Sequence, residues 1–350
     1  MQALLLCGGD GTRLRPFTYT QPKSMLPLVN KPLLYYILES FAAAAVEKVV
    51  IILGPNGQVI EDLLTTEHPY GLKYEFVYQP EPLGLAHAVQ VAGDALQYGP
   101  FLMYLGDNLL AEPLRPLIAR FEEEKPDALV LLREVKNPQQ FGVALLEKGQ
   151  VVRVEEKPKV PRSNLALVGI YLFSAAIHQA VRRIKPSWRG ELEITDAIQE
   201  LIDQGKTVTS HRLSGWWKDT GSVMDLLEAN KYFLKKITPR HDGEVKKSEI
   251  SGPLVLGKGS QLKNCLIKGP VAIGAGCKIS GSVLGPYLSV GDEVEIVNSR
   301  ISNAIILPRG QIKELSLATG ILGERVKVVG SGSKNKDSSL FLGADAVVKF

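Results

Sequence analysis

Short apolar runs alternate with stretches of helical periodicity over the first 135 residues. The apolar runs predict strands at 3–7, 48–53, 74–78, 101–105 and 128–132. Helices are predicted between them, near 32–45, 57–66, 85–96 and 114–124. This alternation is typical of a parallel sheet with helices on both faces, which binds ligands at the carboxyl ends of its strands. We therefore expect an α/β, Rossmann-like fold at the N-terminus.

The pattern becomes mixed between about 140 and 236. It predicts strands at 142–146, 151–155 and 167–173, followed by helices near 190–204 and 222–235. We interpret this stretch as an α+β extension that completes the pocket of the preceding sheet. One catalytic domain is therefore expected over 1–237, with a linker at 238–250.

A repeat dominates the C-terminal part of the chain. A short apolar and glycine-containing motif begins at 256, 273, 290 and 307, a spacing of 17 residues. Apolar rows keep the same register, one made of Leu262, Ile279 and Ile296 and another of Ile267, Leu284 and Ile301. A fixed period stacks identical side chains into the core of a solenoid, whereas a β-sandwich gives no reason for it. A parallel β-helix of about four coils is predicted over 251–330. In the tail, 331–339 is expected to be a flexible linker and 340–350 a closing strand.

Composition narrows the function classes. The 350 residues carry 41 basic and 37 acidic side chains, a balance too even for nucleic-acid binding through phosphate neutralisation. Three cysteines without metal-type spacing favour a reducing compartment. No apolar stretch reaches the roughly 18 residues of a membrane span. We expect a soluble cytoplasmic protein of two domains that binds small anions, with no nucleic acid or membrane as partner.

A glycine-rich loop directly follows the first predicted strand. It carries Gly8, Gly9 and Gly11, then Thr12 and Arg13. Its backbone can approach a phosphate closely, but it lacks the Gly-Lys-Ser/Thr ending of a P-loop. A second cation, Lys23, stands ten residues after Arg13 in the sequence. Two cations beside a glycine cradle suit a triphosphate whose charge is neutralised as it reacts.

Another predicted strand ends in Asp107. An aspartate here is commonly a turn or helix-capping residue. The alternative is a Mg²⁺ ligand, because this hard cation takes carboxylate oxygens together with substrate phosphates. Asp219 is a candidate for the second carboxylate.

Seven motifs in order carry a family resemblance: GGDGTRLRP, PKSMLP, QPEPLGLA, LGDN, EEKP, GELEITD and WKDTGS. With them, the chain resembles the sugar-1-phosphate nucleotidyltransferases over nearly its whole length. It is most similar to the glucose-1-phosphate thymidylyltransferases, in the long form that carries a C-terminal left-handed β-helix of hexapeptide-type repeats.

The resemblance implies a role for each motif. Gly8, Gly9, Gly11 and Thr12 would line the triphosphate, with Arg13 and Lys23 on its phosphates. Gln79 would read the imide edge of the pyrimidine, and Gly84 would let the base approach the backbone. Asp107 and Asp219 would hold Mg²⁺. The sugar phosphate would be bound by Gly142, Glu156, Lys157 and Gly169.

Other readings of these residues are open at this point. Glu156 and Lys157 could belong to a solvated charge run, and Gln79 could be a surface amide. Glu193 and Asp196, in GELEITD, are either sugar-binding or structural.

The reaction implied by the resemblance is in-line, Mg²⁺-dependent transfer of a nucleotidyl group from dTTP or UTP to glucose 1-phosphate, giving dTDP-glucose and pyrophosphate. Arg13, Lys23, Asp107 and Lys157 would be the catalytic residues. The alternatives are a uridylyltransferase for glucose or N-acetylglucosamine 1-phosphate, a GTP-using mannose-1-phosphate relative, and a non-catalytic sugar-nucleotide sensor.

The repeats carry none of the five histidines, which argues against acyl transfer in the β-helix, since that chemistry needs a base titrating near neutrality. The β-helix could form contacts between copies of the chain or hold a regulatory site. A homo-oligomer is expected.

Overall fold

The computed structural model describes residues 1–331 and 338–350. The chain forms two compact units. The first comprises Met1–Asp10 and Leu34–Asp219, and the second comprises Gly11–Leu33 and Thr220–Phe350. None of the described helices is long and apolar enough to cross a membrane.

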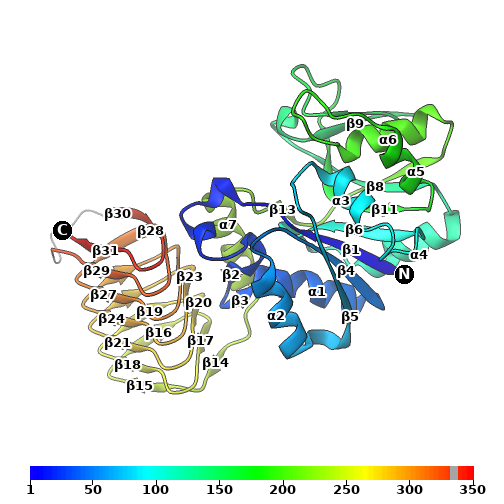
Figure 1. The fold of residues 1–350 in the computed structure, drawn as a ribbon. Helices are drawn as coiled ribbons and strands as arrows, with labels where there is room; N and C mark the ends of the chain where they lie inside the picture. Colours follow the sequence, from blue (N-terminus) through cyan, green and yellow to red (C-terminus); the bar gives the residue numbers. More distant parts are fainter. Residues whose placement is uncertain (332–337) are drawn as a thin grey trace. The chain divides into compact units, whose positions relative to one another are not determined.

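A nine-stranded sheet forms the centre of the first unit (Figure 1). Its strands are β1 (Gln2–Cys7), β4 (Lys48–Leu53), β5 (Lys73–Tyr78), β6 (Phe101–Leu105), β8 (Ala128–Glu134), β9 (Gly142–Glu147), β10 (Gln150–Glu156), β11 (Leu165–Phe173) and β12 (Val208–Arg212). The main path runs β10-β9-β11-β6-β1-β4-β5. As predicted, β1 pairs in parallel with β4 and β6, and β4 with β5. The carboxyl ends of these four strands therefore lie at one edge of the sheet.

The other side of the sheet corrects the expectation of a purely parallel arrangement. The fully buried strand β11 runs antiparallel to both β6 and β8, so β8 does not pair with the earlier parallel strands. Strand β12, which the sequence reading missed, is parallel to β8. The sheet is mixed because the segment after residue 140 supplies a strand that inserts between β6 and β8.

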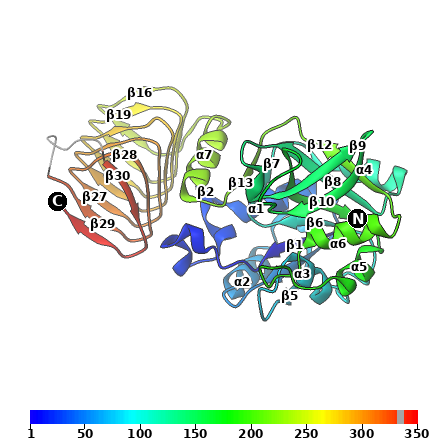
Figure 2. The same ribbon diagram turned by 90° about the horizontal axis from the view of Figure 1, so that it is seen from above.

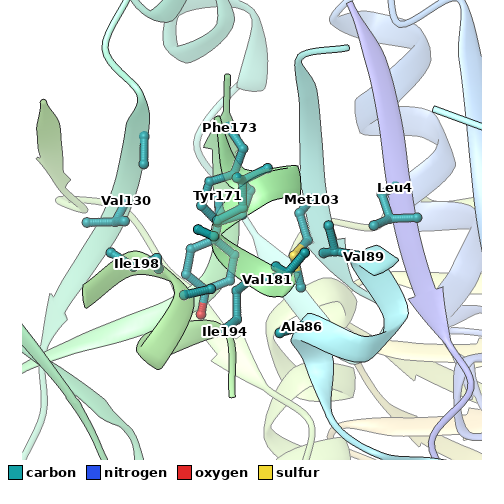
Figure 3. Close-up of a cluster of buried hydrophobic side chains, with 14 of the residues drawn as sticks. Leu4, Ala86, Val89, Met103, Val130, Tyr171, Phe173, Val181, Ile194 and Ile198 are labelled. Atoms are coloured by element: carbon teal, nitrogen blue, oxygen red, sulfur yellow. The ribbon is translucent and has the colours of Figure 1, made fainter. Parts of the chain in front are cut away.

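Helices pack on this sheet close to where the periodicity predicts them. They are α1 (Leu33–Ala43), α2 (Gln58–Glu67), α3 (Leu85–Val91), α4 (Leu114–Glu124), α5 (Ile177–Arg183) and α6 (Ile194–Asp203). Only α5 was not predicted. Helices α3, α5 and α6 contact one another over a core that includes Val89, Met103, Tyr171, Val181 and Ile198 (Figure 3). This core anchors the strand and helix ends that carry the candidate site.

In the second unit, the segment Gly11–Leu33 packs with α7 (Val223–Leu234) and the β-helix. It forms three short 3₁₀ turns, η1 (Thr12–Leu14), η2 (Phe17–Tyr19) and η3 (Lys23–Met25), and the hairpin of β2 (Pro27–Leu28) and β3 (Lys31–Pro32). The buried Asn230 on α7 accepts hydrogen bonds from the Val29 amide (2.9 Å) and from Ser289 Oγ (2.8 Å). Asn30 Nδ2 donates to the Val290 carbonyl at 2.8 Å. These bonds tie both pieces to the β-helix, which a domain boundary at residue 237 does not anticipate.

The C-terminal repeats form a parallel coil (Figures 1 and 2), consistent with the expected left-handed β-helix. One sheet stacks β15 (Glu244–Lys246), β18 (Gln261–Lys263), β21 (Lys278–Ser280), β24 (Glu295–Val297), β27 (Gln311–Lys313), β29 (Lys327–Val329) and β31 (Val347–Lys349). The other contains β14 (Arg240–His241), β16 (Glu249–Ser251), β17 (Leu254–Leu256), β19 (Leu266–Lys268), β20 (Val271–Ile273), β22 (Val283–Leu284), β23 (Leu288–Val290), β25 (Arg300–Ile301), β26 (Ala304–Ile306), β28 (Ser316–Leu322) and β30 (Ser338–Leu342).

Both predicted apolar rows are confirmed. Ile279 pairs with Leu262 and with Ile296, and Leu284 pairs with Ile267 and with Ile301. The repeat is not constant, however. Its period falls from 17 to 16 in the next coil, because Ile296 lies opposite Ile312.

The extent of the β-helix also differs from the prediction. Seven strands stack on one face of the β-helix, whereas four coils would supply only four. The coil begins earlier than expected, because β14, β15 and β16 already pair in parallel with strands of the following coil. The expected linker at 238–250 is therefore largely the first coil. Of the expected flexible tail, 332–337 lie outside the described residues. The closing strand is confirmed, since β30 and β31 pair with β28 and β29.

Candidate functional site

The carboxyl ends of the four parallel strands carry the first predicted site residues. Gly8 follows β1, Gly54 follows β4 and Gln79 follows β5. A Cβ atom on Gly8 would lie 3.4 Å from the Gly54 amide nitrogen and 3.5 Å from Gln79 Oε1. Gly9 has open space around it. The structure therefore brings Gly8 and Gln79 together, and a side chain at position 8 would fill the gap between them.

Gln79 is buried, with 8% of its surface exposed, so it is not a surface amide. Its backbone N–H donates to the Leu53 carbonyl at 2.8 Å, which continues the pairing of β5 with β4. Its side-chain Nε2 lies 2.9 Å from His87 Nδ1 and 3.4 Å from the Gly84 carbonyl oxygen. With the amide nitrogen turned toward these two groups, the carbonyl Oε1 is the part of the amide on the Gly8 side.

Gly84 occupies a backbone conformation that favours glycine, with φ at +107°. A Cβ atom there would lie 2.4 Å from the Leu192 carbonyl oxygen. The flanking backbone explains the closeness, because the Leu192 amide donates to Leu83 (2.7 Å) and the Leu192 carbonyl accepts from the Ala86 amide (3.0 Å). Gly84 therefore fixes the loop before α3 against the segment that leads into α6.

The second unit holds the predicted phosphate-binding cations. Gly11, with φ at +59°, opens the turn η1, and its carbonyl accepts a 2.8 Å hydrogen bond from Thr18 Oγ1. A Cβ atom on Gly11 would lie 3.5 Å from Lys23 Cβ, so the lysine stem packs beside this glycine. Arg13 and Thr12 are exposed on η1, and the Arg13 guanidinium lies over Gly221, where a Cβ atom would come within 3.0 Å of Nη1. The Arg13 guanidinium and the Lys23 stem thus each lie beside a glycine, where a larger residue would crowd them.

The two predicted metal ligands lie on one two-stranded ribbon of the first unit. Asp107 directly precedes β7 (Asn108–Leu110), and Asp219 ends β13 (Trp217–Asp219) opposite Asn108. Asn108 is buried, donates to Asp107 Oδ1 at 2.8 Å and accepts from Trp217 Nε1 at 2.7 Å. Two carboxylates on paired strands suit a hard divalent cation. No cluster of three or more metal-ligating side chains occurs in residues 1–331 and 338–350, so such an ion would need further oxygens from substrate or water.

Glu156 and Gly142 face each other across the hairpin of β9 and β10. A Cβ atom on Gly142 would lie 3.1 Å from Glu156 Oε2, which also accepts a 3.2 Å hydrogen bond from Thr195 Oγ1. Lys157 Nζ lies 3.6 Å from Glu156 Oε1. The Glu156 side chain is only 17% exposed, against 45% for Glu155, so it is not part of a solvated charge run.

Gly169 lies in a bulge of β11, where the pairing with β8 shifts. Its φ is +70°, and a Cβ atom there would lie 2.7 Å from Leu105 Cδ1 and 3.0 Å from Asn108 Nδ2. A larger residue would displace Asn108, which holds Asp107. Gly169, one of the predicted sugar-phosphate residues, thus lies beside the asparagine that donates to the predicted metal ligand Asp107.

Sequence reasoning missed Arg189, which immediately precedes the GELEITD motif. Its guanidinium lies 3.6 Å from Glu156 Oε1, 3.2 Å from Glu193 Oε1 and 2.7 Å from Glu191 Oε1. Burial and the neighbouring Glu156 raise the pKa of Glu193, while a hydrogen bond from Ser187 and the positive charge of Arg189 act against this rise. Burial, followed by the charge of Glu156, also raises the pKa of Asp196. An arginine directly before a motif with two glutamates was the available signal.

The sequence pattern of the family described as nucleotidyl transferase matches residues 2–236. The chain belongs to the nucleotidyltransferase family. It is an enzyme of that family, with a β-helix added after the matched region.

Named relatives of this nucleotidyltransferase match over nearly its whole length. A glucose-1-phosphate thymidylyltransferase of Streptomyces griseus is 42% identical over 346 residues, covering 98% of each chain. Another from Streptomyces antibioticus is 44% identical over 335 residues, covering 95% of this chain and 94% of the relative.

Solved structures agree with the fold of the N-terminal region. A protein of Bacillus anthracis assigned as a glucose-1-phosphate thymidylyltransferase, in complex with sucrose, superposes with a TM-score of 0.63 at 33% identity. The match covers 68% of this chain and 96% of that one. A UDP-glucose pyrophosphorylase complexed with UDP-glucose gives a TM-score of 0.62 at 28% identity, covering 68% of this chain and all of that one.

Proposed function

We propose that this nucleotidyltransferase transfers a thymidylyl group from dTTP to glucose 1-phosphate, producing dTDP-glucose and pyrophosphate. The observation that carries the proposal is the buried amide of Gln79, whose Oε1 faces Gly8 at the edge of the sheet. Such an oxygen accepts the N3–H of a thymine or uracil ring. Thymidylyltransferases among its relatives support dTTP, and the likeness to a UDP-glucose pyrophosphorylase supports UTP as a second nucleotide.

The phosphate end of the nucleotide is proposed to bind the loop at Gly8, Gly9, Gly11 and Thr12. Backbone N–H groups of a glycine loop donate to phosphate oxygens, and a glycine has no side chain to obstruct the approach. Arg13 and Lys23 neutralise the charge that moves onto pyrophosphate as it leaves.

The sugar phosphate is proposed to bind at Gly142, Glu156, Lys157 and Gly169. Glu156 accepts hydrogen bonds from sugar hydroxyls, and Lys157 binds the phosphate. Thr195 holds Glu156 in place, with a 3.2 Å hydrogen bond to Oε2. Arg189, which also lies within 3.6 Å of Glu156, is a further cation near this carboxylate.

Mg²⁺ is the proposed metal ion, held by Asp107 and Asp219. When bound, it would neutralise phosphate charge and favour attack at the α-phosphorus. The attacking sugar-phosphate oxygen is already anionic, so no general base is required, and the side chains act by positioning and charge neutralisation.

We also propose a homo-oligomer with contacts on the last coil of the β-helix. Phe341, Val347 and Phe350 leave 39%, 65% and 59% of their surfaces exposed. Light scattering on the wild type and on Val347→Glu tests this, and a wild-type monomer at all concentrations would remove the proposal.

The decisive experiment is a matrix of nucleoside triphosphates against sugar 1-phosphates, with pyrophosphate release scored as kcat/KM in the presence of Mg²⁺ and after chelation. We expect the highest values for dTTP and UTP with glucose 1-phosphate, and loss of activity after chelation. Higher values for mannose or N-acetylglucosamine phosphates would contradict the substrate assignment, and no release with any pair would contradict the enzymatic proposal.

A further inference from the structure

Gln79 holds its amide in one orientation through two neighbours on the loop and helix that follow it. The Gly84 carbonyl can only accept, and it lies 3.4 Å from Gln79 Nε2. It is already the acceptor of the first helical bond of α3, from the Ala88 amide at 3.3 Å. The shorter contact of the amide nitrogen, 2.9 Å, is to His87 Nδ1.

We propose that His87 is a specificity-determining positioning residue, which turns the carbonyl of Gln79 toward the nucleotide base by accepting a hydrogen bond at Nδ1. The proposal rests on the function proposed above, in which Gln79 reads the base. It adds a residue that touches neither the base nor the reacting atoms.

The orientation of this amide decides which pyrimidine fits. Thymine and uracil present an N3–H donor, which needs the carbonyl oxygen of Gln79. Cytosine presents an N3 acceptor, which needs the amide nitrogen instead. When Nε2 donates to His87 and Gly84, Oε1 is left for the imide N–H, and a cytosine ring faces an acceptor.

The reverse orientation is disfavoured only while His87 Nδ1 accepts. When the ring proton of His87 is on Nε2, Nδ1 is an acceptor, and a turned amide would place Oε1 against two acceptors, this nitrogen and the Gly84 carbonyl, with which it cannot pair. Without the His87 acceptor, only the long contact to Gly84 opposes the turn. Loss of one buried hydrogen bond of this kind corresponds to roughly a two- to tenfold effect on binding.

The test compares three substitutions by titration calorimetry with dTTP and with dCTP, and by steady-state kinetics. His87→Leu removes the acceptor. His87→Asn keeps an oxygen at about the place of Nδ1. Val89→Ala removes buried side-chain volume from the same helix without touching the amide, and is the matched control.

We expect His87→Leu to lower the dTTP to dCTP affinity ratio about tenfold and to raise the KM for dTTP, with the KM for glucose 1-phosphate unchanged. His87→Asn should restore the ratio to within about twofold of the wild type, and Val89→Ala should leave it unchanged. An unchanged ratio in His87→Leu, or an equal loss in Val89→Ala, would overturn the inference.

Gln79→Leu separates this inference from the proposed function. If Gln79→Leu abolishes base preference while His87→Leu does not, Gln79 reads the base and the inference about His87 alone is wrong. If neither substitution changes the preference, Gln79 does not read the base and both assignments fail. Calorimetry measures base preference directly, so the result does not depend on which sugar phosphate the enzyme uses.

Discussion

Four neighbouring strands of the mixed N-terminal sheet pair in parallel and in register, as the strands of the C-terminal β-helix do, yet the two regions use this arrangement differently. In the β-helix each coil repeats the previous one, and residues such as Leu262, Ile279 and Ile296 form continuous buried rows. In the N-terminal sheet the strands are followed by unlike residues, Gly8, Gln79 and Asp107 among them. Repetition spreads stability over many equivalent side chains, whereas the strand ends concentrate chemistry on single positions.

The largest expected effect comes from a single position at a strand end. Asp107→Asn keeps an oxygen that can accept from Asn108 Nδ2 but removes the proposed metal-binding charge. We expect kcat to fall about 10²- to 10³-fold with little change in Tm. Pyrophosphate release and a thermal scan measure the two quantities.

Asp203→Asn is the matched control for this substitution, because Asp203 is exposed at the end of α6. It should retain wild-type activity. Activity of Asp107→Asn within a few-fold of the wild type would remove Asp107 from the catalytic set.

A substitution in a stacked apolar row of the β-helix should have the opposite effect, a loss of stability with kcat unchanged. Ile279 is 2% exposed between Leu262 and Ile296, so Ile279→Ala leaves a cavity in the middle of the row and costs about 2–4 kcal/mol. In a solenoid each coil contacts only its neighbours. Val348→Ala, on the last strand and only partly buried, should therefore cost about 1 kcal/mol or less.

Calorimetry of the β-helix transition, combined with kcat per folded molecule, tests this gradient. Both variants should keep wild-type kcat. Equal destabilisation by Ile279→Ala and Val348→Ala would show that the middle of the β-helix does not contribute more to stability than its last strand.

Gly84 belongs to both sides of this comparison, because its tightly packed backbone also contacts Gln79, the residue proposed to bind the base. At φ +107°, with Leu192 O 2.4 Å from the Cβ position, Gly84→Ala must shift the loop that carries the Gln79 contact. The strain amounts to about 1–3 kcal/mol, and we expect the KM for dTTP to rise about tenfold. Gly71→Ala, also at positive φ but in open space, is the control and should leave KM unchanged.

The same contrast explains what the sequence could predict. The rows of the β-helix were readable because a period of 17 leaves one register for the apolar positions, until the coil that shortens to 16. The four parallel strands were readable from their apolar runs. The place of β11 between β6 and β8 could not be predicted, because a strand that is buried on both faces has the same apolar sequence pattern whichever strands it pairs with.

Within the candidate site, single motifs identified Gly8, Gln79, Asp107 and Glu156. The sequence did not reveal the partners that orient them. His87 and Arg189 lie 8 and 33 residues along the chain from Gln79 and Glu156, and only folding brings their side chains into contact. Local pattern thus identifies groups that act, and tertiary structure identifies groups that position them.

Loop anchoring also differs between the two regions. In the β-helix, neutral hydroxyls connect neighbouring coils: Ser282 Oγ accepts from the Ser299 amide at 3.0 Å, and Ser299 Oγ accepts from the Leu315 amide at 3.1 Å. In the N-terminal unit, one carboxylate anchors the loop before β13. Glu112 Oε1 accepts from the Ser214 and Gly215 amides at 2.7 and 2.6 Å.

This difference predicts that acid weakens the N-terminal anchor and leaves the β-helix anchors intact. Burial alone would raise the pKa of Glu112, but hydrogen bonds from Gly215, His211 and Ser214 outweigh it and lower the pKa to about 2. A carboxyl with a lowered pKa stabilises the fold above its unfolded pKa near 4.5, and this contribution is lost as the pH falls toward 2.

Between pH 7 and pH 3 the wild type should lose about 1–2 kcal/mol more stability than Glu112→Gln, which keeps the acceptor without the charge. Denaturant unfolding of the N-terminal unit at both pH values measures the difference. Ser299→Ala should reduce stability equally at both, and an equal pH dependence in Glu112→Gln and the wild type would show that the anchor is not electrostatic.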